Sequence, residues 1–201
     1  MNYQKQLDLT LEEIKEKKYV PTLLLHSCCG PCSSYVLEYL SNYFKITIFY
    51  YNPNIDTKEE YEKREKEQIR LLKEMKFKNP VSYLKCEYNP KEYYEKVKGF
   101  EKEKEGGMRC HICYELRLEK TAQVAKANNF DYFTTTLSVS PYKNATVLNE
   151  LGKQFQEKYH VFYLFSDFKK KEGYKRSILL SKEYELYRQN YCGCIYSKRN
   201  M

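Results

Sequence analysis

Residues 22–51 read TLLLHSCCGPCSSYVLEYLSNYFKITIFYY, and this stretch decides the fold class. The short apolar run Thr22–Cys29 predicts a buried strand, and Ser33–Tyr43 predicts a helix. Lys45–Tyr51 is β-branched and aromatic, so it predicts a second strand, which Asn52-Pro53-Asn54 ends. A strand, a helix and a strand in this order predict two parallel strands joined by a right-handed crossover.

The rest of the chain continues this alternation. A charged helix is expected from about Thr57 to Phe77, with Thr57 and Glu60 forming a capping box. Its apolar side is predicted to carry Tyr61, Ile69, Leu72 and Met75. Further strands are expected at Val81–Glu87, Asp131–Leu137 and His160–Phe165, and further helices at Pro90–Val97, Cys110–Asn128, Val147–Lys158 and Ser177–Gln189. We therefore predict one α/β domain over residues 1–201, a parallel sheet with flanking helices. In such folds, ligands bind beyond the carboxyl ends of the strands, where the strand order reverses.

Composition favours a globular, cytoplasmic protein. Charged residues of both signs make up 31% of the chain and are interspersed, which argues against disorder. No apolar run approaches the roughly 18 residues that cross a bilayer, and the first residues lack the apolar core of a secretory signal. We expect no membrane segment. The net charge of +8 suits an anionic partner such as nucleic acid without requiring one.

The cysteines are the most informative residues. The chain contains eight, about 4%, which is below the roughly 8–10% typical of a disulfide-stapled secreted domain. Seven of them form three tight groups, Cys28-Cys29-x-x-Cys32, Cys110-x-x-Cys113 and Cys192-x-Cys194. Such grouping in an intracellular chain indicates metal or redox chemistry rather than structural disulfides. All three groups lie at predicted helix ends, so they can converge on one rim of the sheet.

The groups favour different chemistries. Thiolates in the first two suit zinc or an iron–sulfur cluster, and a chain that needs no metal to fold favours the cluster. A disulfide between Cys192 and Cys194 would close a very small, easily reduced ring, which suits a two-electron store; a further pair of metal ligands is the alternative. Cys86 is predicted to serve packing, and His26 to be a hydrogen-bonded core histidine.

Six motifs follow one another along the chain. They are HSCCGPC (26–32), YNPNI (51–55), RCHICY (109–114), TLSVSPYK (136–143), SDFKK (166–170) and YRQNYCGC (187–194). Together they resemble the QueH family of epoxyqueuosine reductases, the cobalamin-independent type, from about residue 22 to 197. The resemblance implies a fold similar to the adenine-nucleotide-hydrolase-like (HUP) group. It also implies the last step of queuosine biosynthesis, the reduction of epoxyqueuosine to queuosine at the wobble position of tRNA.

The resemblance implies roles for individual cysteines. The ligands of a [4Fe–4S] cluster would be Cys28, Cys29, Cys110 and Cys113. Cys192 and Cys194 would form the redox-active pair, in a C-terminal tail at about 190–201. The family position of Cys32 is not always cysteine, so Cys32 either ligates an additional iron or only lines the site. The implied partners are a tRNA carrying epoxyqueuosine in its anticodon and an electron donor that the residues do not identify.

Other functional details stay open at this point. Asp167 and Tyr142 are both candidates for the proton donor, and the lysines after Asp167 are candidates for binding anticodon phosphates. An ATP-pyrophosphatase-type tRNA-thiolating enzyme would share the fold but needs an S-G-G-x-D-S phosphate loop, where this chain has Ser27–Cys32. A zinc-stabilised RNA-binding module is a further alternative, which iron and sulfide content would separate from a reductase.

Overall fold

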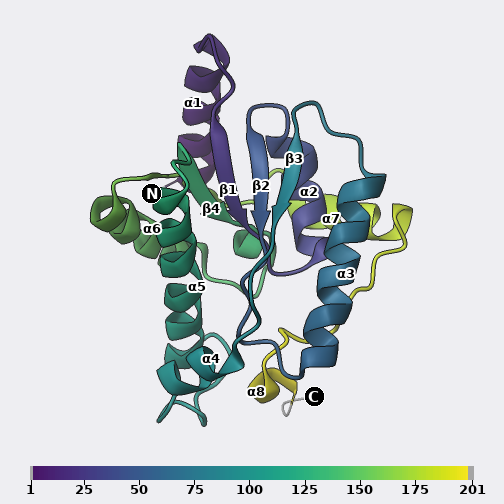
Figure 1. Ribbon diagram of the computed structural model, residues 1–201, viewed down its shortest axis with the longest axis vertical. Helices are drawn as coiled ribbons and strands as arrows, with labels where there is room; N and C mark the ends of the chain where they lie inside the picture. Colours follow the sequence, from purple (N-terminus) through teal and green to yellow (C-terminus); the bar gives the residue numbers. More distant parts are fainter. Residues whose placement is uncertain (1, 199–201) are drawn as a thin grey trace.

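Five parallel strands form one sheet in the order β3-β2-β1-β4-β5 (Figure 1). This computed structural model describes residues 2–198. The strands are β1 (Thr22–His26), β2 (Lys45–Phe49), β3 (Val81–Leu84), β4 (Tyr132–Thr135) and β5 (Phe162–Tyr163). The prediction of an α/β fold with a parallel sheet and flanking helices is confirmed.

Eight α-helices and one 3₁₀ helix are present in the described chain. They are α1 (Tyr3–Glu16), α2 (Gly30–Leu40), α3 (Lys58–Glu74), α4 (Pro90–Lys96), α5 (Met108–Ala127), η1 (Thr136–Val139), α6 (Ala145–Tyr159), α7 (Gly173–Glu183) and α8 (Ile195–Lys198). Between residues 2 and 198, none of these helices is both long and apolar enough to cross a membrane.

Some boundaries differ from the prediction for local reasons. Strand β1 stops at His26 because Cys29 is already the N-cap of α2. Only two residues of the predicted strand at 160–165 join the sheet, since His160 adopts a left-handed conformation as the C-cap of α6. The last long helix, α7, begins at Gly173 and ends at Glu183, and residues 184–194 form turns and irregular structure instead of its predicted final turns.

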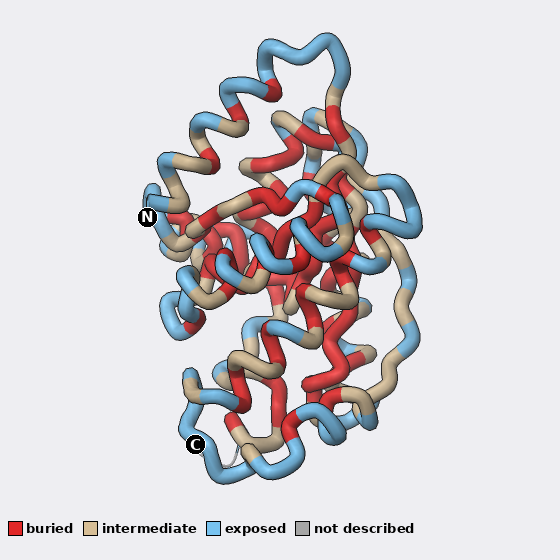
Figure 2. The backbone as a smooth tube through the Cα atoms, turned by 90° about the vertical axis from the view of Figure 1, so that its left-hand side faces the viewer, coloured by how far each residue is buried: buried red, intermediate tan, exposed pale blue. Residues whose placement is uncertain are grey.

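Helices cover both faces of the sheet, as Figure 1 shows. On one face, α1 and α2 pack on β1 and β2 through a cluster that includes Leu11, Leu25 and Leu37. On the other face, α5 and α6 pack on β1 and β4 through a cluster that includes Leu24, Leu118 and Phe133. Successive residues of a strand point to opposite faces, so β1 contributes to both clusters. Figure 2 shows that buried positions concentrate in the strands and on the inner sides of the helices.

The buried side of α3 differs from the predicted apolar stripe. Of the predicted residues, Tyr61 and the C-cap residue Met75 are buried, whereas Ile69 and Leu72 are half-buried. The other buried residues of α3 are Arg64, Gln68 and Leu71. Gln68 is buried because its side-chain oxygen accepts hydrogen bonds from the hydroxyls of Ser27 and Ser33, both at 2.7 Å. The polar residues of this stripe therefore face the segment that follows β1.

Only one of the two hydrogen bonds of the predicted capping box is formed at the start of α3. Thr57 Oγ1 accepts a hydrogen bond from the Glu60 N–H at 3.2 Å. The Glu60 carboxylate does not return to Thr57 but pairs with Arg64 at 2.7 Å.

The strand order places a reversal point beside β1. The chain passes from β1 to β2 on one side, and β4 lies on the other side of β1. The carboxyl ends of β1 and β4 are therefore the position where ligands bind in this kind of fold. Residues 27–29 follow β1, and Thr136 follows β4.

Candidate metal and redox site

The turn after β1 carries the first cysteine group and is held from both sides. Asn52 donates to the carbonyl of Ser27 at 2.8 Å, from the segment after β2. The Cys28 N–H donates to Thr136 Oγ1 at 3.3 Å, from the segment after β4. Helix α2 starts directly behind this turn, with Cys29 as its N-cap and Cys32 in its first turn. The turn therefore presents its thiols at the sheet edge and at a helix N-terminus, which favours thiolates.

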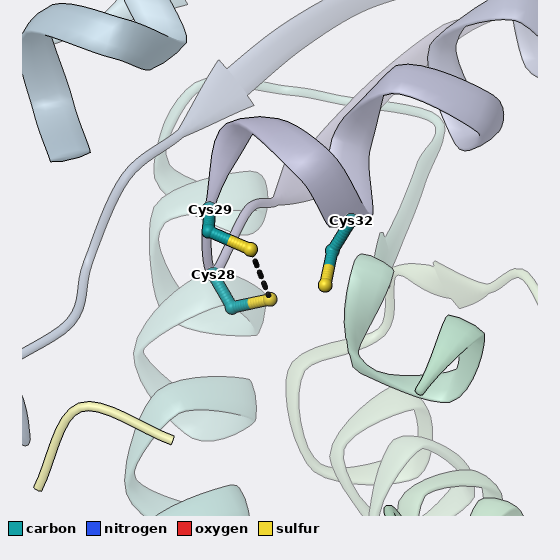
Figure 3. Close-up of side chains that lie close together, drawn as sticks. All are labelled: Cys28, Cys29 and Cys32. Atoms are coloured by element: carbon teal, nitrogen blue, oxygen red, sulfur yellow. Dashed lines mark hydrogen bonds between the residues drawn. The ribbon is translucent and has the colours of Figure 1, made fainter. Parts of the chain in front are cut away.

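Cys28, Cys29 and Cys32 form a triad whose sulfur atoms all lie within 4.8 Å of one another. Figure 3 shows the three side chains pointing toward one another, two from the turn and one from α2. Cys28 donates to Cys29 with a sulfur–sulfur distance of 3.8 Å. Hydrogen bonds from Cys28 and Cys32 lower the pKa of Cys29, and donating to Cys29 raises the pKa of Cys28 to about 11. The triad therefore loses its first proton at Cys29 and offers a soft ligand set to a metal.

His26 is a satisfied core residue, as predicted. Its side chain is 0% exposed. Nε2 lies 3.0 Å from the Tyr51 carbonyl and donates to it, so Nδ1 accepts from the Thr135 hydroxyl at 2.8 Å. Burial lowers the pKa of His26 to about 3, so the ring is neutral. Both ring nitrogens are occupied, and neither is available to a metal.

Cys110 and Cys113 lie buried in the first two turns of α5. The Gly106 N–H donates to Cys110 Sγ at 3.2 Å, and burial raises the pKa of Cys113 to about 12. Cys28 packs against the same apolar cluster that contains Cys110. Among residues 2–198, the triad is the one set of three or more ligating atoms within 4.8 Å, and Cys110 and Cys113 lie outside it. A common metal centre for Cys28, Cys29, Cys110 and Cys113 therefore stays a prediction.

Cys192 and Cys194 lie in different environments on either side of Gly193. Cys192 is half-buried, and its sulfur accepts a hydrogen bond from Lys143 Nζ at 3.3 Å. Cys194 is buried in an apolar cluster with Cys113 and Tyr93, and burial raises its pKa. Gly193 has φ 115°, a conformation that glycine adopts without strain. All eight cysteines are free thiols in this structure.

The segment that carries this pair is held by polar contacts. Arg64 donates to the Cys192 carbonyl at 3.4 Å, and the Asp56 N–H donates to the Gly193 carbonyl at 2.7 Å. Lys198 is the last described residue, so the end of the predicted tail at 190–201 lies outside the described chain.

A cavity of about 440 Å³ connects the triad with Cys192. Its lining includes the triad, Cys192 and Arg117. The aromatic residues of its wall are Tyr142, Tyr174 and Tyr191. This volume lies within the range of small-molecule sites, and thiols and rings converge on it from distant parts of the chain.

The two candidate proton donors are separated. Tyr142 lines the cavity and is 77% exposed at its rim. Asp167 pairs with Lys169 at 3.1 Å and lines a different cavity, beside the start of α1. Lys171, which directly follows the SDFKK motif, pairs with Asp8 at 2.6 Å.

Three cationic residues at the site were not assigned a role from the sequence. They are Arg64, Arg117 and Lys143, and all three are buried. A signal existed for Arg117, which is four residues after Cys113 and seven after Cys110, and so lies on the same side of α5. Lys143 stands in the quoted TLSVSPYK motif, but only the tertiary structure places it against Cys192.

Comparison with known proteins places the chain in one family. The family model described as epoxyqueuosine reductase QueH matches residues 23–200. The chain is 42% identical over 201 residues to epoxyqueuosine reductase QueH of Streptococcus pyogenes serotype M1, covering 99% of this chain and 79% of that protein. It is 38% identical over 182 residues to the protein of the same name from Thermotoga maritima, covering 88% of this chain and 90% of the relative. The chain therefore belongs to the epoxyqueuosine reductase QueH family of oxidoreductases.

Proposed function

We propose that this protein reduces epoxyqueuosine to queuosine at the wobble position of tRNA, the last step of queuosine biosynthesis. Besides family membership, one structural observation supports this proposal. The Cys192 thiol and the Cys28–Cys29–Cys32 triad line a single cavity, although more than 150 residues separate them in sequence. A redox thiol and a candidate metal site thus face one bound substrate. A tRNA substrate is consistent with an enzyme of the cytoplasm.

The residues present fit an iron–sulfur cluster. The donor set consists of thiols at two helix N-termini, those of α2 and α5. The Gly106 N–H already donates to the sulfur of Cys110, as backbone amides do toward cluster thiolates. We assign Cys28, Cys29, Cys110 and Cys113 as ligands of a [4Fe–4S] cluster, which supplies one-electron transfer when bound. Cys32, within 4.8 Å of Cys28 and Cys29, is assigned to an additional iron.

The thiol pair supplies the electrons for the net reaction. Conversion of the epoxide to an alkene breaks both C–O bonds, forms a C=C bond and releases the oxygen as water. This needs two electrons and two protons, and Cys192 and Cys194 release both as their thiols become one disulfide. An external electron donor then returns the pair to thiols. Because Cys192 faces the cavity and Cys194 is buried behind it, Cys192 is the member that approaches the substrate.

The cavity also suits a nucleobase taken out of its stack. Enzymes that modify a base inside folded nucleic acid extrude it into a pocket. Tyr142 lies at the mouth of this cavity, and Arg188 and Tyr174 are part of its wall. Aromatic rings and guanidinium groups stack on unpaired RNA bases. We therefore assign the anticodon loop of the tRNA to this face of the protein.

An anaerobic assay on epoxyqueuosine-containing tRNA with a chemical reductant tests the function. Mass spectrometry of the nucleosides should show epoxyqueuosine replaced by queuosine, and the Cys192→Ser variant should leave the epoxide intact. Protein that contains zinc without iron or sulfide and converts nothing would point to an RNA-binding module instead. Modification that depends on ATP would point to thiolation chemistry.

A further inference from the structure

Arg117 is a fully buried arginine without a carboxylate partner. Its side chain is 1% exposed, and across residues 2–198 it forms no salt bridge. Its Nε donates to the Cys113 carbonyl at 3.1 Å, while its Nη2 has no hydrogen-bond partner in the described chain. A buried charge without a counter-charge is strongly unfavourable, so this arrangement indicates an anion beside the guanidinium.

Of the other two fully buried arginines, one has a carboxylate partner and the other, like Arg117, has none in the part of the chain that the structure describes. Arg64 is neutralised by Glu60 at 2.7 Å. Arg109 donates to backbone carbonyls in the loop before α5, among them that of Glu101 at 3.1 Å. Of these three side chains, Arg117 is the one that lines the thiol cavity.

The groups around Arg117 that can become anionic metal ligands are mainly thiols. Arg117 shares the cavity wall with the triad and Cys192. Burial opposes its charge, yet Cys113, Cys192 and Cys28 raise the pKa of Arg117. The only carboxylate in the same wall belongs to Glu105, which already pairs with Lys143 at 3.3 Å. Within the cavity wall, the remaining source of an anion for Arg117 is therefore a thiolate or a centre held by thiolates.

We propose that Arg117 is the counter-cation of the metal–thiolate centre and raises its midpoint potential. This inference rests on the proposed function, because it requires that the cysteines hold an iron–sulfur cluster. Reduction adds one negative charge to such a cluster, and a buried cation stabilises that charge far more than an exposed one. The net charge around a cluster and the hydrogen bonds to its sulfurs set its potential, and Arg117 offers both a charge and a free N–H group. Arg117 therefore acts on the metal–thiolate centre and does not itself touch the reacting atoms of the substrate.

Redox titration of reconstituted protein tests the role of Arg117. Wild type, Arg117→Gln and Arg117→Lys are loaded with iron and sulfide under anaerobic conditions and titrated while visible absorbance and electron paramagnetic resonance are followed. Lys158→Met is the matched control, because it removes one positive charge from an exposed lysine of α6 that pairs with Glu119 of α5. Arg117→Gln should make reduction of the cluster at least tenfold less favourable. For one electron, this lowers the midpoint potential by about 59 mV. Arg117→Lys should recover part of the shift, and Lys158→Met should match wild type.

Cluster assembly in the two variants distinguishes the charge of Arg117 from its shape. Failure of Arg117→Gln to assemble a cluster, with assembly retained in Arg117→Lys, would also support a counter-cation. Failure of both variants would show that the shape of arginine matters rather than its charge, and would overturn the inference. A fully loaded Arg117→Gln protein with an unchanged midpoint potential would also overturn the inference. If that variant had lost tRNA binding, the guanidinium would serve the substrate and not the metal centre. Wild-type protein that takes up no iron would instead overturn the proposed function itself.

Discussion

Lys143 Nζ donates a hydrogen bond to Cys192 Sγ at 3.3 Å. Lys143 is only 7% exposed, and its other partner is the Glu105 carboxylate, also at 3.3 Å. Burial opposes the charge of this ammonium, but Cys192, Tyr114 and Glu105 raise the pKa of Lys143. A permanent cation beside one sulfur of the C-terminal pair makes the two cysteines inequivalent, since a nearby cation stabilises a thiolate.

Replacing Lys143 with methionine should make Cys192 less reactive. A hydrogen bond to a charged group is worth about 1.5–3 kcal/mol, so alkylation of Cys192 at neutral pH should slow by roughly 10- to 150-fold. Peptide mass spectrometry after timed iodoacetamide treatment measures this rate. The Lys143→Arg variant keeps the charge and should retain most of the reactivity. Equal alkylation rates in wild type and Lys143→Met would show that the lysine does not activate the sulfur.

Substitutions should distinguish the proposed cluster ligands from the proposed redox-active pair. Cys110→Ser removes a proposed cluster ligand and should abolish the brown absorbance of reconstituted protein. Cys192→Ser should keep the colour and iron content but lose turnover, because the dithiol can no longer supply two electrons. Cys86→Ser is the matched control, since this lone thiol donates only to the Glu87 carbonyl at 3.6 Å. Bleaching of the Cys192→Ser protein would contradict this division of roles.

The Cys32→Ser variant tests the assignment of an additional iron. A [4Fe–4S] cluster contains equal numbers of iron and sulfide, so an extra iron appears as iron in excess of sulfide. Cys32→Ser should remove this excess and leave the sulfide content unchanged. Parallel loss of sulfide would instead make Cys32 a cluster ligand, and unchanged iron would leave it with a lining role.

Tyr142 should contribute to tRNA affinity without contributing to stability. The ring is 77% exposed at the cavity rim, so its removal leaves the core intact. Stacking of one base on an aromatic ring is worth about 1–3 kcal/mol, and Tyr142→Ala should therefore weaken tRNA binding by roughly 5- to 150-fold. Fluorescence anisotropy with labelled tRNA measures the change, and Tyr142→Phe should bind like wild type. An unaltered dissociation constant for Tyr142→Ala would place the anticodon loop elsewhere.

The order of strands and helices could be predicted because it depends on local sequence patterns. Apolar runs such as Leu23–Leu25 and β-branched runs such as Ile46–Ile48 identify buried strands without knowledge of their neighbours. Helix α1 was not predicted, although Leu7, Leu11 and Ile14 recur on its buried side at helical spacing. The ends of the elements were less readable, since they depend on caps such as His160 that adopt their conformation in context.

The residue types of the site were also present in the sequence. Clustered thiols, the six ordered motifs and the absence of a phosphate loop after the first strand are all one-dimensional information, and they identified the family to which the chain belongs. They did not show which thiols lie together. The triad includes Cys32, whose role the motifs left open, because the first turn of α2 aims it back at Cys28 and Cys29.

Sequence by itself determined the fold class, the family and the chemistry available to this protein, because local periodicity and residue type carry that information. Only the tertiary structure decided where the cations lie. The stripe of α3 that holds Arg64 and the side of α5 that holds Arg117 are buried because other elements cover them. A buried charge needs an anion or several hydrogen-bond acceptors beside it, and the packing of segments far apart in the chain decides whether these are present.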